Sequence, residues 1–206
     1  MKQIFFCLIL TITITFISSC KFIMLKYYGI HQPQICTSSG IYKFLTKKNA
    51  QNVLSFACRD TVEHNKFMSK ISFPEAHFFD GSGFYISYKP SSKICNSGVD
   101  SFIYELKHQK GNSDTSFNIN YILLGKVNLE NHKEYNLTNL PKSDFFVVLI
   151  YTEYLGKLND IKTFNWLANI DKVNQNHEIQ ITPIMISADY FDFWGISKNY
   201  IPEFDY

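Results

Sequence analysis

The hydrophobic pattern is strongest between residues 145 and 186, where two apolar segments flank a polar one. Phe145–Tyr151 is an unbroken apolar run rich in β-branched and aromatic residues, which is typical of a strand buried on both faces of a parallel sheet. Apolar residues then recur at roughly helical spacing over residues 161–170, and a second apolar strand is predicted over 179–186. These segments predict one β-α-β unit, around which an α/β sheet is built.

Shorter apolar segments precede this unit and alternate between strand and helix patterns. A Thr-Ser-Ser cluster beginning at Thr37 is a suitable N-cap for one of the helices. In chain order, the predictions are a strand over 22–28, a helix that follows the cap at Thr37 and whose end Asn49 and Asn52 bracket, a strand over 53–57, a helix over 61–70 and a helix over 99–106.

A β-hairpin is predicted where two aromatic runs flank the turn sequence Asp80-Gly81-Ser82-Gly83. The alternation after this turn, over residues 84–88, is typical of a half-exposed edge strand. The polar residues 111–116 predict a linker. A strand is expected over 121–127, followed by an amphipathic or irregular segment over 129–140.

Length and charge narrow the class of protein. The 206 residues suffice for one large domain or two small ones, and the linker predicts units at 20–110 and 117–206. The formal net charge of +2 gives no basic surface that indicates nucleic-acid binding. Nothing after residue 20 approaches the apolar run of about 18 residues that spans a membrane, so a soluble mature body is expected.

Residues 1–19 are predicted to be a signal peptide. Lys2 supplies a positive n-region, residues 4–17 an apolar h-region, and two serines before Cys20 a small-residue cleavage site. Residues 17–20 resemble the lipobox of bacterial lipoproteins, in which signal peptidase II cuts before the cysteine and the thiol is diacylated. The alternatives are an ordinary signal peptide, or an N-terminal helix that stays in the membrane with no role for Cys20.

The lipobox resemblance implies a membrane partner and a location. Each buried methylene of an acyl chain contributes roughly 0.8 kcal/mol, so two or three chains on Cys20 would hold the protein firmly on a bilayer. Lys21 follows the cysteine where an aspartate would direct retention in the inner membrane, which favours the outer membrane. The next residues carry no acidic cluster of the kind associated with export to the cell surface, so a periplasm-facing position is expected.

The order of predicted elements over residues 22–108 resembles the thioredoxin core, in which a proline precedes the third strand and an Asp-Gly hairpin joins it to the fourth. Pro74 matches that proline, which is cis in the family. Residues 119–194 resemble the N-terminal portion of a second such domain. The resemblance implies a thioredoxin-like α/β fold, with a central mixed sheet flanked by helices, built as two units. A single large mixed sheet made from both halves is the alternative.

A second resemblance concerns three phrases of the mature chain. Residues 25–33, 144–151 and 155–159 are similar to a group of uncharacterised Bacteroidetes lipoproteins. The group carries no known activity, so this resemblance bears on class and location only.

Cysteine chemistry separates the functional hypotheses. In redox-active thioredoxins the central strand ends in Cys-x-x-Cys, whereas residues 151–157 contain no cysteine, which excludes dithiol exchange there. Cys36 opens a predicted helix in a Cys-x-x-Ser pattern, where a helix N-terminus would favour the thiolate and Pro74 could lie opposite. The alternatives are a structural thiol, or a disulfide with Cys58 or Cys95 in an oxidising periplasm.

Other chemistry has weaker support. His31 and His77 are expected to meet near Cys36 and Pro74, but no His-x-x-x-His or Cys-x-x-Cys spacing predicts a metal site. The chain has no Gly-x-Ser-x-Gly elbow of a hydrolase and no phosphate loop. Glu153 follows the central strand, where an α/β site or a solvated loop charge is expected.

The aromatic residues of the tail, 190–206, either cap the core or form a binding edge.

Taken together, the sequence predicts an envelope lipoprotein without a cofactor. It is expected to act as a non-catalytic binding or scaffold protein, with another envelope protein as a candidate partner. The alternative is a monothiol oxidoreductase or isomerase that uses Cys36 and Pro74.

Overall fold

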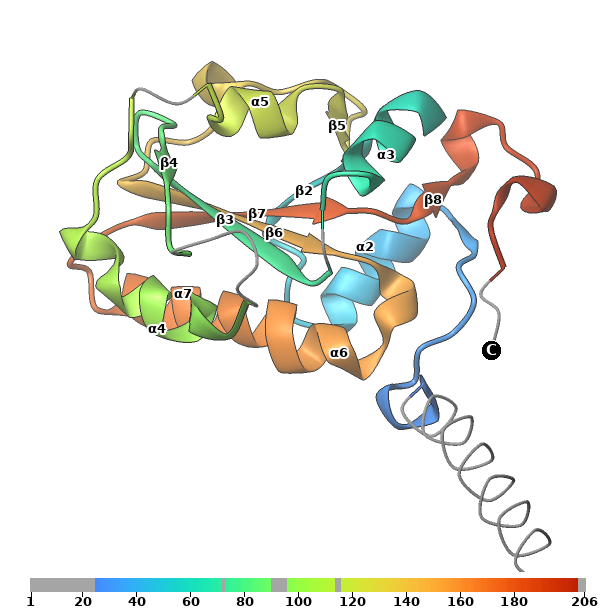
Figure 1. Cartoon of the computed structure of the whole chain (residues 1–206), viewed down its shortest axis with the longest axis horizontal. Coiled ribbons are helices and arrows are strands. Elements are labelled where there is room, and N and C mark those ends of the chain that lie inside the picture. Colours follow the sequence, from blue (N-terminus) through green and yellow to red (C-terminus); the bar gives the residue numbers. More distant parts are fainter. Residues whose placement is uncertain (1–24, 72, 90–95, 114–115, 204–206) are drawn as a thin grey trace, which may run out of the picture.

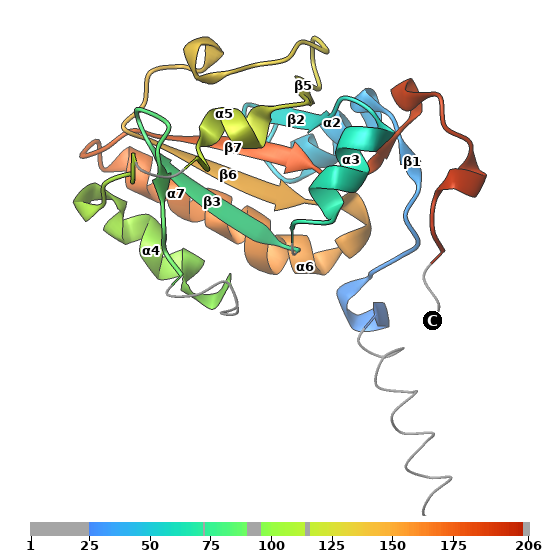
Figure 2. The ribbon, with the colours of Figure 1, turned by 45° about the horizontal axis from the view of Figure 1, so that its top comes forward.

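The computed structural model describes residues 25–71, 73–89, 96–113 and 116–203. It has a mixed α/β fold, in which helices cover both faces of a six-stranded sheet (Figures 1 and 2). The strand order is β4-β3-β6-β7-β2-β5. The strands are β2 (Leu54–Cys58), β3 (Glu75–Asp80), β4 (Tyr85–Ile86), β5 (Lys126–Asn128), β6 (Phe145–Tyr151) and β7 (Ile181–Ser187).

The predicted β-α-β unit forms the centre of this sheet. Strands β6 and β7 are parallel, with Phe145 opposite Ile181, and every residue of β6 is buried. Between them run the short helix α6 (Lys157–Asn159), a π-helical turn and the helix α7 (Asn165–Gln175). The unbroken apolar run therefore predicted a doubly covered central strand correctly.

The predicted hairpin is also present, as strands β3 and β4. The Asp80 carboxylate accepts hydrogen bonds from the backbone N–H groups of Ser82 and Phe84, both at 3.0 Å, and so closes the turn. Strand β3 runs antiparallel to β6, with Glu75 opposite Ile150. Pro74, whose peptide bond with Phe73 is cis, therefore enters the sheet at the end where β6 finishes.

The two faces of the sheet carry separate cores. Val147, Leu149 and Tyr151 face one core, whereas Phe146, Val148 and Ile150 on the same strand face the other, as the two-residue period of a strand requires. The first core is covered by α2 (Ser38–Lys47), α4 (Val99–Glu105) and α7, and the second by α3 (Thr61–Met68) and α5 (Ile119–Leu123).

Two predicted strands are helical in the structure. Residues 25–28 are helical rather than extended, and Gly29 ends that turn with φ +63°, its N–H donating to the carbonyl of Lys26. Residues 119–123 form α5, because the Asn118 side chain accepts a hydrogen bond from the Tyr121 N–H and caps a helix. Only β5, at the end of the predicted 121–127 segment, is a strand.

Strands from both halves of the chain interleave in the one sheet. Strand β2 pairs with β7 on one side and β5 on the other, and β3 pairs with β6. The sheet thus corresponds to the alternative of a single large mixed sheet rather than to units at 20–110 and 117–206. The first residue of the predicted linker, Gly111, is bound to the hairpin, since its N–H donates to the Asp80 carboxylate at 3.1 Å.

The predicted signal peptide and Cys20 lie outside the described residues. Within the described part of the chain, no helix has the length and apolar character needed to cross a membrane.

Candidate functional site

A first cavity lies where β6 and β7 end, the edge at which open α/β sheets commonly bind ligands. It measures about 230 Å³, and its lining includes His31, Cys36, Glu153 and Asp189. Two short strands, β1 (Ile35–Cys36) and β8 (Tyr190–Phe191), pair beside it in parallel. They bring an early segment of the described chain next to a late one. We refer to this space as the strand-end cavity.

Asp189 is the most buried titratable group of the strand-end cavity, with 2 % of its surface exposed. Its two carboxylate oxygens accept hydrogen bonds from the Glu153 N–H at 2.9 and 3.0 Å, and the Ser187 hydroxyl donates to it at 2.7 Å. Burial raises the pKa of Asp189 to about 7, against the opposing effect of these hydrogen bonds. Asp189 thereby joins the end of β7 to the end of β6.

The surroundings of Cys36 favour its protonated thiol, which is less reactive than the thiolate. Its thiol donates to the Glu153 carboxylate at 3.5 Å, and burial together with the charges of Asp189 and Glu153 raises its pKa well above the ordinary range. We expected a helix N-terminus to stabilise the Cys36 thiolate, but its surroundings in the structure favour the neutral thiol instead. Cys36 does not open helix α2, because the N-cap is Thr37, whose hydroxyl accepts from the Gly40 N–H at 2.8 Å.

The other residues predicted near Cys36 are only partly brought together. His31 lines the strand-end cavity, but His77 lies on β3 and lines a different pocket, so the two histidines do not meet. Pro74 is buried at the β6 end of β3, where its carbonyl accepts a hydrogen bond from the Asn96 side chain. Among the described residues, no three His, Cys, Asp or Glu side chains are placed to hold a metal ion.

The remaining cysteines do not supply a disulfide with Cys36 in the described structure. Cys58 is buried at the end of β2, and both it and Cys36 are free thiols. Cys95 lies outside the described residues. In the aromatic tail, Tyr190 and Phe191 are buried and the Trp194 indole donates to the Cys58 carbonyl at 3.0 Å, so this part of the tail caps the core.

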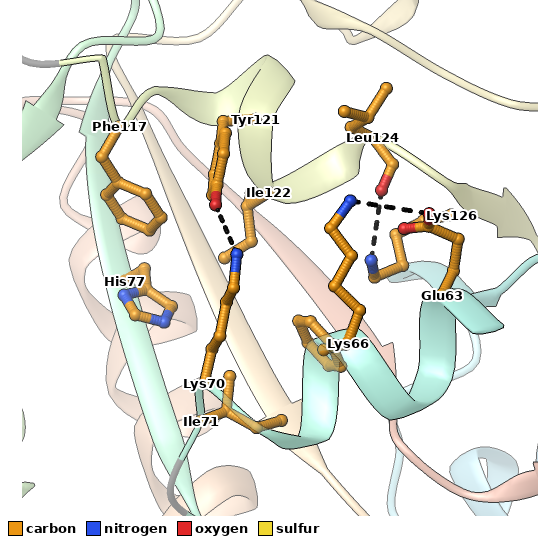
Figure 3. Close-up of a pocket in the computed structure, with 11 residues that line it drawn as sticks. Glu63, Lys66, Lys70, Ile71, His77, Phe117, Tyr121, Ile122, Leu124 and Lys126 are labelled. Atoms are coloured by element: carbon orange, nitrogen blue, oxygen red, sulfur yellow. Dashed lines mark hydrogen bonds and ion pairs between the residues drawn. The ribbon is translucent and has the colours of Figure 1, made fainter. Parts of the chain in front are cut away.

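A second pocket opens on the face of the sheet that α3 and α5 cover, between these helices and β3 (Figure 3). Its wall is apolar, and three lysines surround it, one on α3, one in the turn after α3 and one on β5. The apolar side chains are Phe67, Ile71, Phe117, Ile122 and Leu124, and the lysines are Lys66, Lys70 and Lys126. We refer to it as the lysine pocket.

Two of the lysines, Lys66 and Lys70, contact polar side chains at the mouth of the lysine pocket. The Lys70 ammonium donates to the Tyr121 hydroxyl at 2.9 Å, which joins the turn after α3 to α5 (Figure 3). The Lys66 ammonium lies 3.7 Å from the carboxylate of Glu63, the acidic residue of the lining. Lys66 is on α3 and Lys70 is in the turn that follows the helix, four residues later, so their ammonium groups reach the same mouth.

Lys126 is the buried cation of the lysine pocket, with 3 % of its surface exposed. Its ammonium donates to the Leu124 carbonyl at 3.2 Å and lies 4.4 Å from the centroid of the Phe67 ring. Burial lowers its pKa. Sequence reasoning missed this pocket, although Lys66 and Lys70 at four-residue spacing on a predicted helix were visible.

Comparison of the chain with profiles of protein families, with curated protein sequences and with solved structures found no match. Function is therefore inferred from the geometry of the two cavities.

Proposed function

We propose that this protein is a non-catalytic binding protein, held at the bacterial envelope by a lipid on Cys20, and that it binds its ligand in the lysine pocket. The observation that carries the proposal is the pocket itself: a concave apolar wall surrounded by Lys66, Lys70 and Lys126. Apolar walls with a few convergent polar groups are the usual form of ligand sites in proteins. The strand-end cavity, in contrast, holds its polar groups in mutual hydrogen bonds.

The environment of Cys36 argues against the oxidoreductase alternative. A catalytic thiol reacts as its thiolate, which positive charge or a helix N-terminus stabilises. Cys36 instead faces two acidic residues, Glu153 and Asp189, and its proton is directed at a carboxylate. The geometry thus supports binding rather than thiol exchange.

The fold is proposed to be a thioredoxin-like arrangement whose elements appear in an altered order along the chain. A proline-preceded strand, β3, forms a hairpin with β4 and pairs with the parallel β-α-β unit, as the resemblance implies. The end of the central strand β6 carries Thr152 and Glu153 in place of a cysteine. A binding role agrees with a scaffold of this kind that lacks the paired thiols.

Maleimide labelling of Cys36 tests the absence of thiol chemistry. At neutral pH we expect Cys36 in the native protein to react at least about tenfold more slowly than in the protein unfolded in guanidinium, because burial and two carboxylates oppose its ionisation. Peptide mapping by mass spectrometry distinguishes Cys36 from Cys58 and Cys95. The matched variant Glu153→Gln should react faster, since one opposing charge is removed. Fast and selective labelling of native Cys36 would instead support the oxidoreductase.

The lipid anchor is tested by Cys20→Ser. We expect this variant to lose incorporation of labelled palmitate in cells and to leave the membrane fraction, because the thioether-linked acyl chains supply the anchorage. Cys58→Ser serves as the control and should remain acylated. If the unsubstituted chain takes up no palmitate, the ordinary signal peptide or the retained helix explains the N-terminus better.

A further inference from the structure

We propose that the lysine pocket binds a small aromatic carboxylate, one ring in size, with the carboxylate at Lys66 and Lys70 and the ring against Phe67, Phe117 and Ile122. This inference rests on the proposed function and specifies the class of ligand. It is carried by three properties of the pocket: its size, the charge at its mouth and an unpaired nitrogen in its wall.

The size limits the part of the ligand that is buried. The lysine pocket is open at its mouth and has a volume of about 130 Å³, and an apolar cavity of about 150 Å³ holds one benzene molecule. Phe117 and Tyr121 meet edge to face with ring centroids 5.5 Å apart, so aromatic surface already lines the space. A further ring would find the offset or edge-on contacts that aromatic groups prefer.

The charge at the mouth selects an anion. Of the charged residues in the lining, three are lysines and one is the acidic Glu63, so the local balance is positive. Lys70 makes its 2.9 Å hydrogen bond to a tyrosine hydroxyl, and the contact between Lys66 and Glu63 is long at 3.7 Å. A ligand carboxylate would give both ammonium groups a close, charge-assisted hydrogen bond.

His77 adds a polar atom to the wall. Its Nδ1 is buried and has no hydrogen-bond partner among the described residues, whereas Glu75 lies 3.9 Å from its Nε2. Burial lowers the pKa of His77 to about 4, so the ring is neutral at pH 7. A proton on Nε2, facing Glu75, leaves Nδ1 as an acceptor. A hydroxyl on the ligand ring would satisfy it, which makes a hydroxybenzoate a better fit than benzoate.

Calorimetric titration of the full chain in lipid nanodiscs tests this assignment with three probes of one shape: benzoate, benzyl alcohol and benzylamine. We expect benzoate to bind at least about tenfold more tightly than benzyl alcohol, benzylamine to bind most weakly, and added salt to weaken the benzoate interaction. We also expect 4-hydroxybenzoate to bind more tightly than benzoate, and His77→Phe to remove that difference.

The matched variants keep the side-chain length and remove the charge. Lys66→Met with Lys70→Met should reduce benzoate affinity at least about tenfold and leave benzyl alcohol unchanged. Lys47→Met, an exposed position on α2 across the sheet that lines none of these cavities, should change neither. The Lys66 side chain is 55 % exposed, so folding should tolerate its change.

The outcomes separate the two levels of the proposal. Equal affinity for the three probes, or a benzoate affinity insensitive to the double lysine change, would overturn the carboxylate class while the pocket remained a binding site. Failure of every probe to bind would overturn the lysine pocket as the site of the proposed function. Loss of affinity in Lys47→Met equal to that in the double variant would show a non-specific charge effect and overturn the carboxylate assignment.

Discussion

The Asp189→Asn variant should gain stability over the unsubstituted protein as the pH rises. The difference between their free energies of unfolding should be about 3 kcal/mol larger at pH 7 than at pH 4. Burial raises the pKa of Asp189 to about 7 in the folded protein, whereas the unfolded chain releases this proton near its ordinary value of 3.8. The folded state therefore binds the proton over an interval in which the unfolded state does not. The stability contributed by Asp189 is complete below about pH 4 and is lost as the pH rises to about 7.

Asparagine imitates the protonated acid without titrating. Its amide oxygen can accept from the Glu153 N–H, and its amide group can donate to the Ser187 hydroxyl oxygen. Denaturant unfolding at a series of pH values measures the difference between the two proteins, which cancels the effect of all other titrating groups. Glu178→Gln, at a fully exposed carboxylate, is the control and should leave a small difference of opposite sign, because Lys107 lowers the pKa of Glu178. A constant difference for Asp189→Asn would show that Asp189 is ionised throughout.

Local signals predicted the elements that depend on neighbouring residues. The apolar run of β6 and the Asp-Gly turn after β3 each determine their structure within a few residues, and both predictions are confirmed. Thr37 was expected to cap the first helix and does so. Residues 119–123 resemble a strand in composition, but the cap at Asn118 favours α5, and Ile119, Ile122 and Leu123 are buried together on one helical face.

The candidate site depends on contacts between distant residues, which a single sequence does not reveal. Glu153 and Asp189 are joined although 36 positions separate them, because β6 and β7 are adjacent and parallel. Lys70 and Tyr121 meet across 51 positions because α3 and α5 cover the same face. Cys36 shows how such contacts change chemistry: the Cys-x-x-Ser pattern suggested a thiolate, but two acidic residues brought in by folding oppose it.

Replacing Gly156 by alanine should lower the free energy of unfolding by about 3 kcal/mol or more. Gly156 has φ +55° and ψ −128°, a conformation that residues with a side chain rarely adopt, and a Cβ there would overlap the carbonyl oxygens of Tyr28 and Gly29. Both of these oxygens belong to the backbone, so the added carbon can be accommodated only if the segment around Tyr28 and Gly29 is displaced. The His31 N–H, which donates to the Tyr154 carbonyl at 3.1 Å, would be displaced with it.

Substitutions at two other glycines separate the cost of the backbone conformation from the cost of the steric overlap. Gly195→Ala, at φ +67° with open space around the added carbon, should cost only about 1 kcal/mol for the backbone conformation. Gly98→Ala, at φ −85° and also in open space, should be nearly neutral. Denaturant unfolding gives the three values, and hydrogen exchange at the His31 amide reports release of the segment. If Gly156→Ala costs no more than Gly195→Ala and His31 stays protected, the close packing of the chain's leading segment on the end of β6 is refuted, because only that packing distinguishes the two positions.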